Sequence, residues 1–163
     1  MSASADASGQ IGGARRLKET CGVLAPTWPQ RTRGAGASLA GVLDGIDHVQ
    51  LAAPPGCEED ARRFFGGLLG LEEVEKPEGL RARGGVWFRV GAQQLHVGVD
   101  PAFAPARKAH PAFSVTGYDA VVARLSAAGI DVADDGLIPG IRRCYVADPW
   151  ENRIELVAVE NGA

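Results

Sequence analysis

Short runs in which polar and apolar residues alternate recur along the chain from residue 45 onward. Successive residues of a strand point to opposite faces of a sheet. In the first run, His48 and Gln50 fall on one face, and Val49 and Leu51 fall on the other. Each run therefore predicts a strand with one polar face and one apolar face suited to packing on a helix. The predicted strands lie at 48–52, 86–90, 94–99, 110–115, 143–146 and 153–157.

Two stretches with helical spacing of apolar residues lie between these strands. The first opens with three acidic residues, which favour the start of a helix because of its dipole, and it ends at Gly70. We interpret Phe64 and Phe65 as core packing rather than as a surface for a ligand. The second stretch ends at Gly129. The apolar positions are Ala61, Phe64, Phe65, Leu68 and Leu69 in the first, and Val121, Val122, Leu125 and Ala128 in the second.

The two halves of this pattern match one another at a spacing of about 60 residues. His48 and His110 each open a strand that leads into a helix, whereas His96 and Glu155 each lie in the last strand of a half. The chain is thus predicted to contain two copies of one unit, each with the order strand, helix and three strands. Module one spans 45–100 and module two spans 108–160.

The sequence holds three histidines, and all of them occupy matching places in the repeat, with Glu155 at the fourth place. Imidazole suits zinc, nickel, iron and similar ions, and a carboxylate adds negative charge. A single histidine on a strand is more often a half-buried residue without a ligand, but the set of four favours a divalent metal site. We expect His48, His96, His110 and Glu155 to be the ligands and Glu155 also to be the catalytic base.

Three motifs carry a resemblance to a known family: Asp47-His48-Val49, the segment 109–113 and the segment 148–156. The last resembles an Asp-Pro-x-Gly-Asn-x-x-Glu-Leu ending. The chain resembles the vicinal oxygen chelate (VOC) superfamily, which includes glyoxalase I, fosfomycin resistance proteins, extradiol dioxygenases and bleomycin resistance proteins. The resemblance covers roughly residues 45 to 160. It implies an α+β, glyoxalase-like fold in which two tandem βαβββ modules form a curved mixed-sheet cup with helices outside.

The resemblance further implies a metal-dependent enzyme of the lyase, isomerase or thiol-transfer type. Its substrate would be a small oxygenated metabolite bound through two oxygens to a divalent zinc, nickel, manganese or iron ion. One alternative is a metal-free protein of the bleomycin resistance type that sequesters a ligand. Another is a single-domain extradiol-type dioxygenase, in which His48, His110 and Glu155 form the metal triad and His96 stays unligated. A third is a pure interaction module. The resemblance also implies a homodimer.

Two residues depart from the family pattern. His96 stands where glyoxalase I enzymes typically place Glu, which puts their proton-shuttling mechanism in doubt for this chain. Glu151 stands where the family usually has Gly. Because that turn position often needs a positive φ, Glu151 predicts local strain or an altered turn.

The polar faces of the remaining strands supply candidate contacts to the substrate. An arginine there offers two parallel hydrogen bonds to a carboxylate or phosphate. The alternative is that these arginines pair with the protein's own acids, including the Glu155 carboxylate. The expected substrate-binding residues are Trp87, Arg89, Arg143, Tyr145, Gln50 and Ser114.

Length and composition limit the remaining possibilities. The 163 residues predict one VOC domain at 41–163, preceded by a flexible N-terminal extension at 1–40 that is rich in Gly, Ala, Ser and Arg. A net charge of −3 gives no electrostatic argument for nucleic acid or an anionic membrane. The three cysteines lack paired spacing, which favours reduced thiols in a cytoplasm. The expected partner is therefore a small-molecule substrate.

Overall fold

The structure is a computed structural model that describes residues 45–159. The described residues all belong to one compact unit of the chain. The flexible extension expected at 1–40 lies outside the described residues. No helix within 45–159 is both long and apolar enough to cross a membrane.

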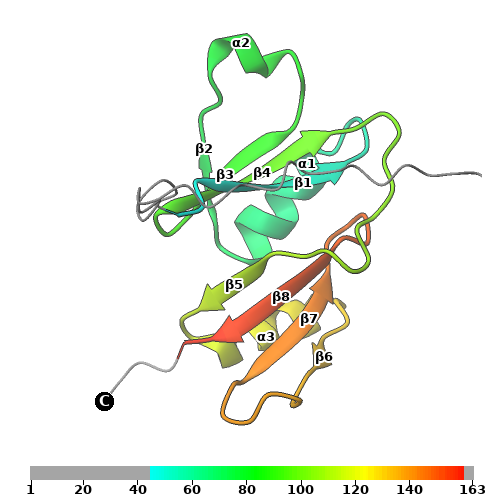
Figure 1. Cartoon of the computed structure of the whole chain (residues 1–163). Helices are drawn as coiled ribbons and strands as arrows, with labels where there is room; N and C mark the ends of the chain where they lie inside the picture. The colour runs from blue at the N-terminus through cyan, green and yellow to red at the C-terminus, as the bar shows by residue number, and fades with distance from the viewer. Residues whose placement is uncertain (1–44, 160–163) are drawn as a thin grey trace, which may run out of the picture. The chain divides into compact units, whose positions relative to one another are not determined.

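The fold is α+β and consists of two βαβββ modules in tandem, as the resemblance implies (Figure 1). Module one forms a four-stranded mixed sheet in the order β1-β4-β3-β2, in which β1 and β4 run parallel. Its elements are β1 (His48–Ala53), α1 (Glu58–Ala61), the π-helix η1 (Arg62–Leu68), β2 (Glu72–Val74), α2 (Glu78–Arg81), β3 (Val86–Val90) and β4 (Gln93–Val99).

Module two repeats this topology in the order β5-β8-β7-β6, with β5 and β8 parallel. Its elements are β5 (Ala112–Val115), α3 (Tyr118–Ala127), β6 (Ala133–Asp134), β7 (Arg143–Ala147) and β8 (Arg153–Ala158). The two sheets are separate within residues 45–159, and β1 and β5 each form an edge of their own sheet.

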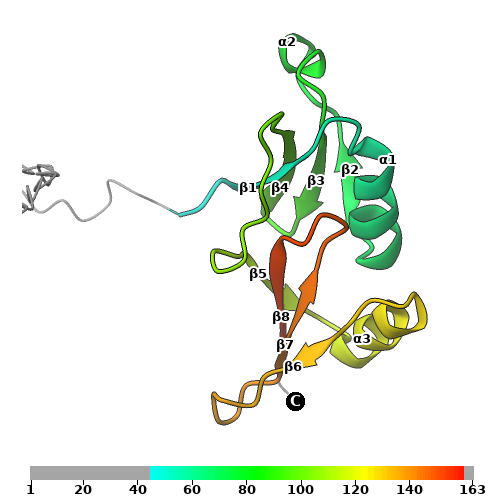
Figure 2. The ribbon, with the colours of Figure 1, turned by 90° about the vertical axis from the view of Figure 1, so that its right-hand side faces the viewer.

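The alternation predicted from the sequence fixes which face of each sheet is buried. In β1, Leu51 and Ala53 are buried while His48 and Gln50 are exposed. In β8, Ile154 and Leu156 are almost fully buried, which leaves Glu155 on the opposite face. The apolar faces pack on helices: η1 lies against β2 and β3, and α3 lies against β8 (Figure 2). Phe64 and Phe65 are core residues, as predicted.

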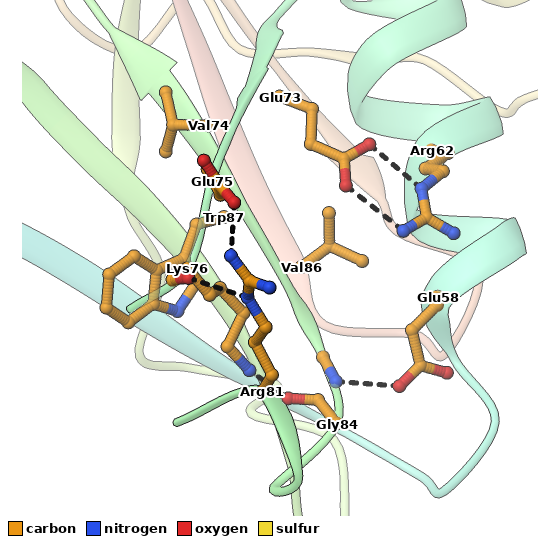
Figure 3. Close-up of a pocket in the computed structure, with 11 residues that line it drawn as sticks. Glu58, Arg62, Glu73, Val74, Glu75, Lys76, Arg81, Gly84, Val86 and Trp87 are labelled. Carbon is orange, nitrogen blue, oxygen red and sulfur yellow. Dashed lines mark hydrogen bonds and ion pairs between the residues drawn. The ribbon is translucent and has the colours of Figure 1, made fainter. Parts of the chain in front are cut away.

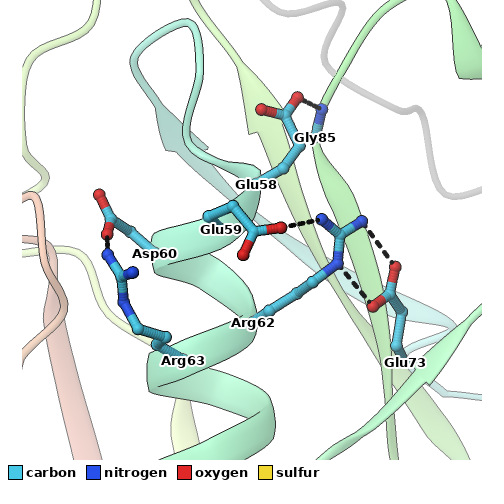
Figure 4. Close-up of polar contacts among 7 residues, drawn as sticks. All are labelled: Glu58, Glu59, Asp60, Arg62, Arg63, Glu73 and Gly85. Atoms are coloured by element: carbon cyan, nitrogen blue, oxygen red, sulfur yellow. Dashed lines mark hydrogen bonds and ion pairs between the residues drawn. The ribbon is translucent and has the colours of Figure 1, made fainter.

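Charged pairs fasten the first helix to the sheet beneath it (Figure 4). Arg62 donates to both carboxylate oxygens of Glu73 on β2, at 2.8 and 3.0 Å, and this contact lowers the pKa of Glu73. Glu58 accepts a hydrogen bond from the backbone N–H of Gly85 at 2.7 Å. Gly85 has φ 80°, and a Cβ there would lie 2.1 Å from the Val97 carbonyl oxygen. The start of β3, which carries Trp87, is therefore held close to both α1 and β4.

A buried turn between β7 and β8 joins module two to module one. Asp148 and Asn152 are both almost inaccessible, and the Asp148 carboxylate accepts hydrogen bonds from the Asn152 side chain and from two backbone N–H groups. Asn152 Nδ2 also donates to the Ala52 carbonyl of β1 at 2.8 Å, and Asn152 Oδ1 accepts from the backbone N–H of Ala106 at 3.1 Å. One side chain thus connects the β7–β8 turn, β1 and the linker between the modules.

The same turn contains the strain that the sequence predicts. Glu151 has φ 69°, the one positive φ at a non-glycine residue within 45–159. A side chain in the left-handed region costs roughly 1–2 kcal/mol because its Cβ approaches the backbone. Glu151 forms an ion pair with Arg107, but both side chains are exposed and such pairs contribute little.

Replacing Asn152 by Ala should destabilise the protein by about 3 kcal/mol or more, because it leaves several buried polar groups without partners. The measurement is chemical denaturation of Asn152→Ala beside Gln93→Ala, an exposed position of β4 that should change stability by less than about 0.5 kcal/mol. A loss below about 1 kcal/mol for Asn152→Ala would show that this turn does not hold the modules together.

Replacing Glu151 by Gly should stabilise the protein by about 0.5–1 kcal/mol, since relief of the left-handed strain outweighs the added freedom of the unfolded chain. Glu151→Gln is the matched control, because it removes the charge and keeps the backbone strain. The measurement is the midpoint of chemical denaturation of each variant and of the parent protein. Equal stability of Glu151→Gly and Glu151→Gln would contradict the assignment of strain to this residue.

Candidate metal and substrate site

In module one, two histidines and a tryptophan form a stack on the polar face of the sheet. Trp87 and His96 are cross-strand neighbours on β3 and β4, and their rings lie parallel with centroids 3.8 Å apart. The His48 ring of β1 stacks on the other side, with its centroid 4.2 Å from that of His96. The alternation of β1, β3 and β4 brings all three rings to one face. We call His48 and His96 the module-one half-site.

The hydrogen bonds of the two rings differ. His48 Nδ1 lies 2.7 Å from the Asp47 carboxylate, so Nδ1 carries the proton and Nε2 keeps its lone pair. His96 uses Nε2 instead, at 2.9 Å from the amide oxygen of Gln94. Burial and the neighbouring His48 lower the pKa of His96, which favours its neutral form.

In module two, His110 and Glu155 form a second pair, which we call the module-two half-site. His110 Nε2 lies 3.0 Å from one carboxylate oxygen of Glu155, and Arg143 donates to the other at 2.9 Å. Arg143 also donates to Asp135 at 2.8 Å. Burial opposes ionisation of Glu155, but the hydrogen bonds from Arg143 and His110 outweigh it, so the pKa of Glu155 lies below its usual value.

The orientation of His110 directs a ring nitrogen at the Glu155 carboxylate, where a cation would be stabilised. His110 Nδ1 lies 2.8 Å from the Lys108 carbonyl oxygen, which can only accept, so Nδ1 carries a proton. In the neutral ring, Nε2 then presents a lone pair to the ionised Glu155. Two such acceptors approach this closely only with a cation between them, either a second proton on the ring or a metal ion. Metal-binding histidines commonly have their other nitrogen held in this way.

A tyrosine surrounded by positive groups lies beside this half-site. Tyr145 pairs with Glu155 across β7 and β8, and its ring lies nearly perpendicular to that of His110, with the centroids 5.4 Å apart. The Arg153 guanidinium lies over the Tyr145 ring at 3.7 Å, and that of Arg143 lies at 5.6 Å. The polar face of module two therefore places two guanidinium groups around one tyrosine ring.

The two half-sites do not merge into one metal centre within the described part of the chain. No group of three or more His, Cys, Asp or Glu side chains among residues 45–159 is placed to hold a metal ion. The structure brings His48 together with His96 and, separately, His110 together with Glu155.

The other expected substrate-binding residues have varied surroundings. Gln50 is exposed and pairs with His96 in the register of β1 and β4, and its amide lies so close to Gly98 that a Cβ there would come within 2.8 Å of it. Arg89 donates to Glu72 at 3.2 Å, and both side chains are largely exposed. Ser114 lines a mainly apolar cavity of about 180 Å³ together with Phe113 and Leu156.

Trp87 also borders a larger cavity of about 340 Å³ between the α2 segment and the first helix (Figure 3). Polar groups that line this cavity already have partners: Arg81 pairs with Glu75, and Lys76 donates to the backbone carbonyl of Gly84. The Lys76 ammonium also lies 6.0 Å from the centre of the Trp87 ring. Trp87 thus lies between this polar cavity and the histidine stack.

Sequence reasoning missed the groups that orient the site. Asp47, Gln94 and Asp135 each hold a predicted site residue in place. Asp47 could have been found, because it precedes His48 in the family-like motif. The contacts of Gln94 and Asp135 depend on how strands and loops meet, which a single sequence does not specify.

Comparisons with known proteins agree with this architecture. No protein-family model and no curated protein matches the chain. Among solved structures, a putative glyoxalase family protein from Bacillus anthracis is 51% identical, with a TM-score of 0.70 over 72% of this chain and 97% of that one.

Two more distant structures show the fold alone. A glyoxalase/dioxygenase from Nostoc punctiforme is 22% identical, with a TM-score of 0.63 over 77% of this chain and 97% of that one. A fosfomycin resistance protein from Listeria monocytogenes is 17% identical, with a TM-score of 0.59 over 73% and 96%. The 51% identity to the first structure, over 72% of this chain and 97% of that one, decides the family. The chain belongs to the glyoxalase family within the vicinal oxygen chelate superfamily.

Proposed function

We propose that the protein is a divalent-metal-dependent enzyme of the glyoxalase-like class, acting on a small metabolite that binds through two oxygens. The observation that carries the proposal is the shared orientation of His48 and His110. Each ring is held at Nδ1 by an oxygen, which leaves Nε2 for a metal. Glu155 supplies the negative charge of a third ligand, held ionised by Arg143. A zinc, nickel, manganese or iron ion would suit these donors.

The bound ion would act as a Lewis acid toward negative charge that develops on the substrate. The protein's own groups would position and desolvate the substrate. Arg143, itself held by Asp135, would keep the Glu155 carboxylate in one orientation. The Glu155 pKa lies below its usual value, which reduces its strength as a base, so its role as catalytic base depends on release from Arg143.

His96 is proposed to lie beside the metal rather than on it. Its Nε2 is engaged by Gln94, its ring lies between Trp87 and His48, and burial favours its neutral form. A neutral imidazole of this kind can accept a proton through Nδ1 near pH 7. Three protein ligands would leave room on a six-coordinate ion for a substrate bound through two oxygens.

The complete site is proposed to form between two chains. Each half-site supplies two donors, and the two do not come together within residues 45–159. Within residues 45–159, β1 and β5 are edge strands whose outer backbone groups have no strand beside them, and a second copy could cover these edges. In this arrangement, module one of one chain would meet module two of its partner, and each dimer would hold two sites.

Metal content of the protein purified without chelators should approach one ion per chain. His48→Ala, His110→Ala and Glu155→Ala should each weaken metal affinity by more than about 100-fold, beyond the effect of losing an outer-sphere partner. His96→Ala is the matched control and should stay within about tenfold of the parent protein. Elemental analysis after dialysis against metal buffers gives both quantities.

Less than about a tenth of an ion per chain, with no uptake of added metal, would contradict the metal proposal. The protein would then fit the ligand-sequestering alternative, with Trp87 and Tyr145 as the main contacts. Equal loss of affinity in His96→Ala and His48→Ala would instead make His96 a fourth ligand.

Mixing two inactive variants tests the assembly across chains. His48→Ala and His110→Ala should each fail to hold metal alone. After subunit exchange, about half the dimers contain one chain of each kind, and each of these has one intact site, so metal should return to about a quarter of the parent level. No recovery after exchange, or a monomer at every concentration in light scattering, would contradict assembly across two chains.

A further inference from the structure

Arg153 is charged and half-buried, yet its guanidinium has no hydrogen bond or ion pair among residues 45–159. Arg143, on the same face, donates to Glu155 and Asp135 and has its Nε buried without a partner. Arg143 is therefore committed to holding the Glu155 carboxylate. Arg153 is the guanidinium of this face whose N–H groups remain available to a ligand.

Stacking on Tyr145 fixes the orientation of Arg153 in advance. The guanidinium carbon lies 3.7 Å from the centre of the Tyr145 ring. Such stacking uses the flat face of the guanidinium and leaves the N–H groups at its edges free to donate. A planar fork of this kind matches the oxygens of a carboxylate or a phosphate, and prior ordering lowers the entropy lost on binding.

The position of Arg153 relates it to the proposed metal ligands. Arg153 and Glu155 are two residues apart on β8 and point to the same face, and Tyr145 is the cross-strand partner of Glu155. The rings of His110 and Tyr145 lie nearly perpendicular, with their centroids 5.4 Å apart. One substrate could therefore contact Arg153 at one end while its paired oxygens lie near His110 and Glu155.

We propose that Arg153, supported by Tyr145, binds an anionic group of the substrate, which is a carboxylate or a phosphate-type group. The inference rests on the proposed function, because it places the anion beside the module-two half-site. It names the substrate class as small oxygenated metabolites that carry a negative charge apart from the two oxygens presented to the metal.

The test is a titration of the ¹⁵N-labelled full chain, as purified, with inorganic phosphate, acetate and uncharged glycerol at constant ionic strength. The arginine Nε–H signal that disappears in Arg153→Gln identifies Arg153. That signal should shift saturably with phosphate, acetate or both, and not with glycerol. The anion that binds more tightly distinguishes a phosphate-type substrate from a carboxylate.

Arg153→Gln should weaken this binding by at least about tenfold, as expected for the loss of charged hydrogen bonds, and Tyr145→Leu should weaken it less. Arg63→Gln, which makes the same change of net charge at an exposed residue of η1, is the matched control and should bind as the parent does. Metal content and light scattering of each variant are measured in parallel.

No saturable shift, or equal affinity in Arg153→Gln and the parent, overturns the inference. A fall in dimer content in Arg153→Gln without any anion binding in the parent also overturns it, since Arg153 would then pair with a carboxylate of the partner subunit. A protein that holds metal but binds neither anion leaves the metal proposal intact. A protein that binds phosphate through Arg153 but no metal supports this inference and contradicts the other.

Discussion

The interaction between Asp148 and Asn152 is the one on which the rest of the arrangement depends. Both side chains are buried, and between them they satisfy backbone groups of the β7–β8 turn, of β1 and of the linker. Burial raises the pKa of Asp148, and the hydrogen bonds from Asn152 oppose that rise. The buried carboxylate therefore depends on Asn152 for its stabilisation. The turn sets where β8 begins and hence where its polar residues point.

A balance of charge on the polar face of module two follows from that placement. Glu155 is held between Arg143 and His110, and Arg143 is neutralised by Glu155 and Asp135. Two consequences follow for chemistry. The ionised carboxylate faces an imidazole nitrogen and is suited to a cation, whereas the stacked Arg153 is suited to an anion. On β8, a residue suited to a cation, Glu155, and a residue suited to an anion, Arg153, therefore lie two positions apart.

Much of the fold could be predicted from the sequence because strand alternation, helical spacing and duplication are local signals. The buried faces of β1 and β8, the core position of Phe64 and the left-handed Glu151 all agree with expectation. The π-helical form of η1 and the stack of Trp87 on His96 were not predicted, because they depend on helix packing and on the register of β3 against β4. The candidate ligands could be predicted from their matching places in the two modules. Their division into two pairs depends on tertiary structure, which the repeat does not specify.

The central claim is that a metal ion lies between the two half-sites of different chains. A crystal structure of the metal-loaded protein, with anomalous scattering recorded at the metal edge, tests it most directly. We expect a peak at about 2.0–2.2 Å from Nε2 of His110, from a carboxylate oxygen of Glu155 and from Nε2 of His48 of the partner subunit. A peak bound by ligands of one chain alone, or a peak away from Glu155, would contradict it.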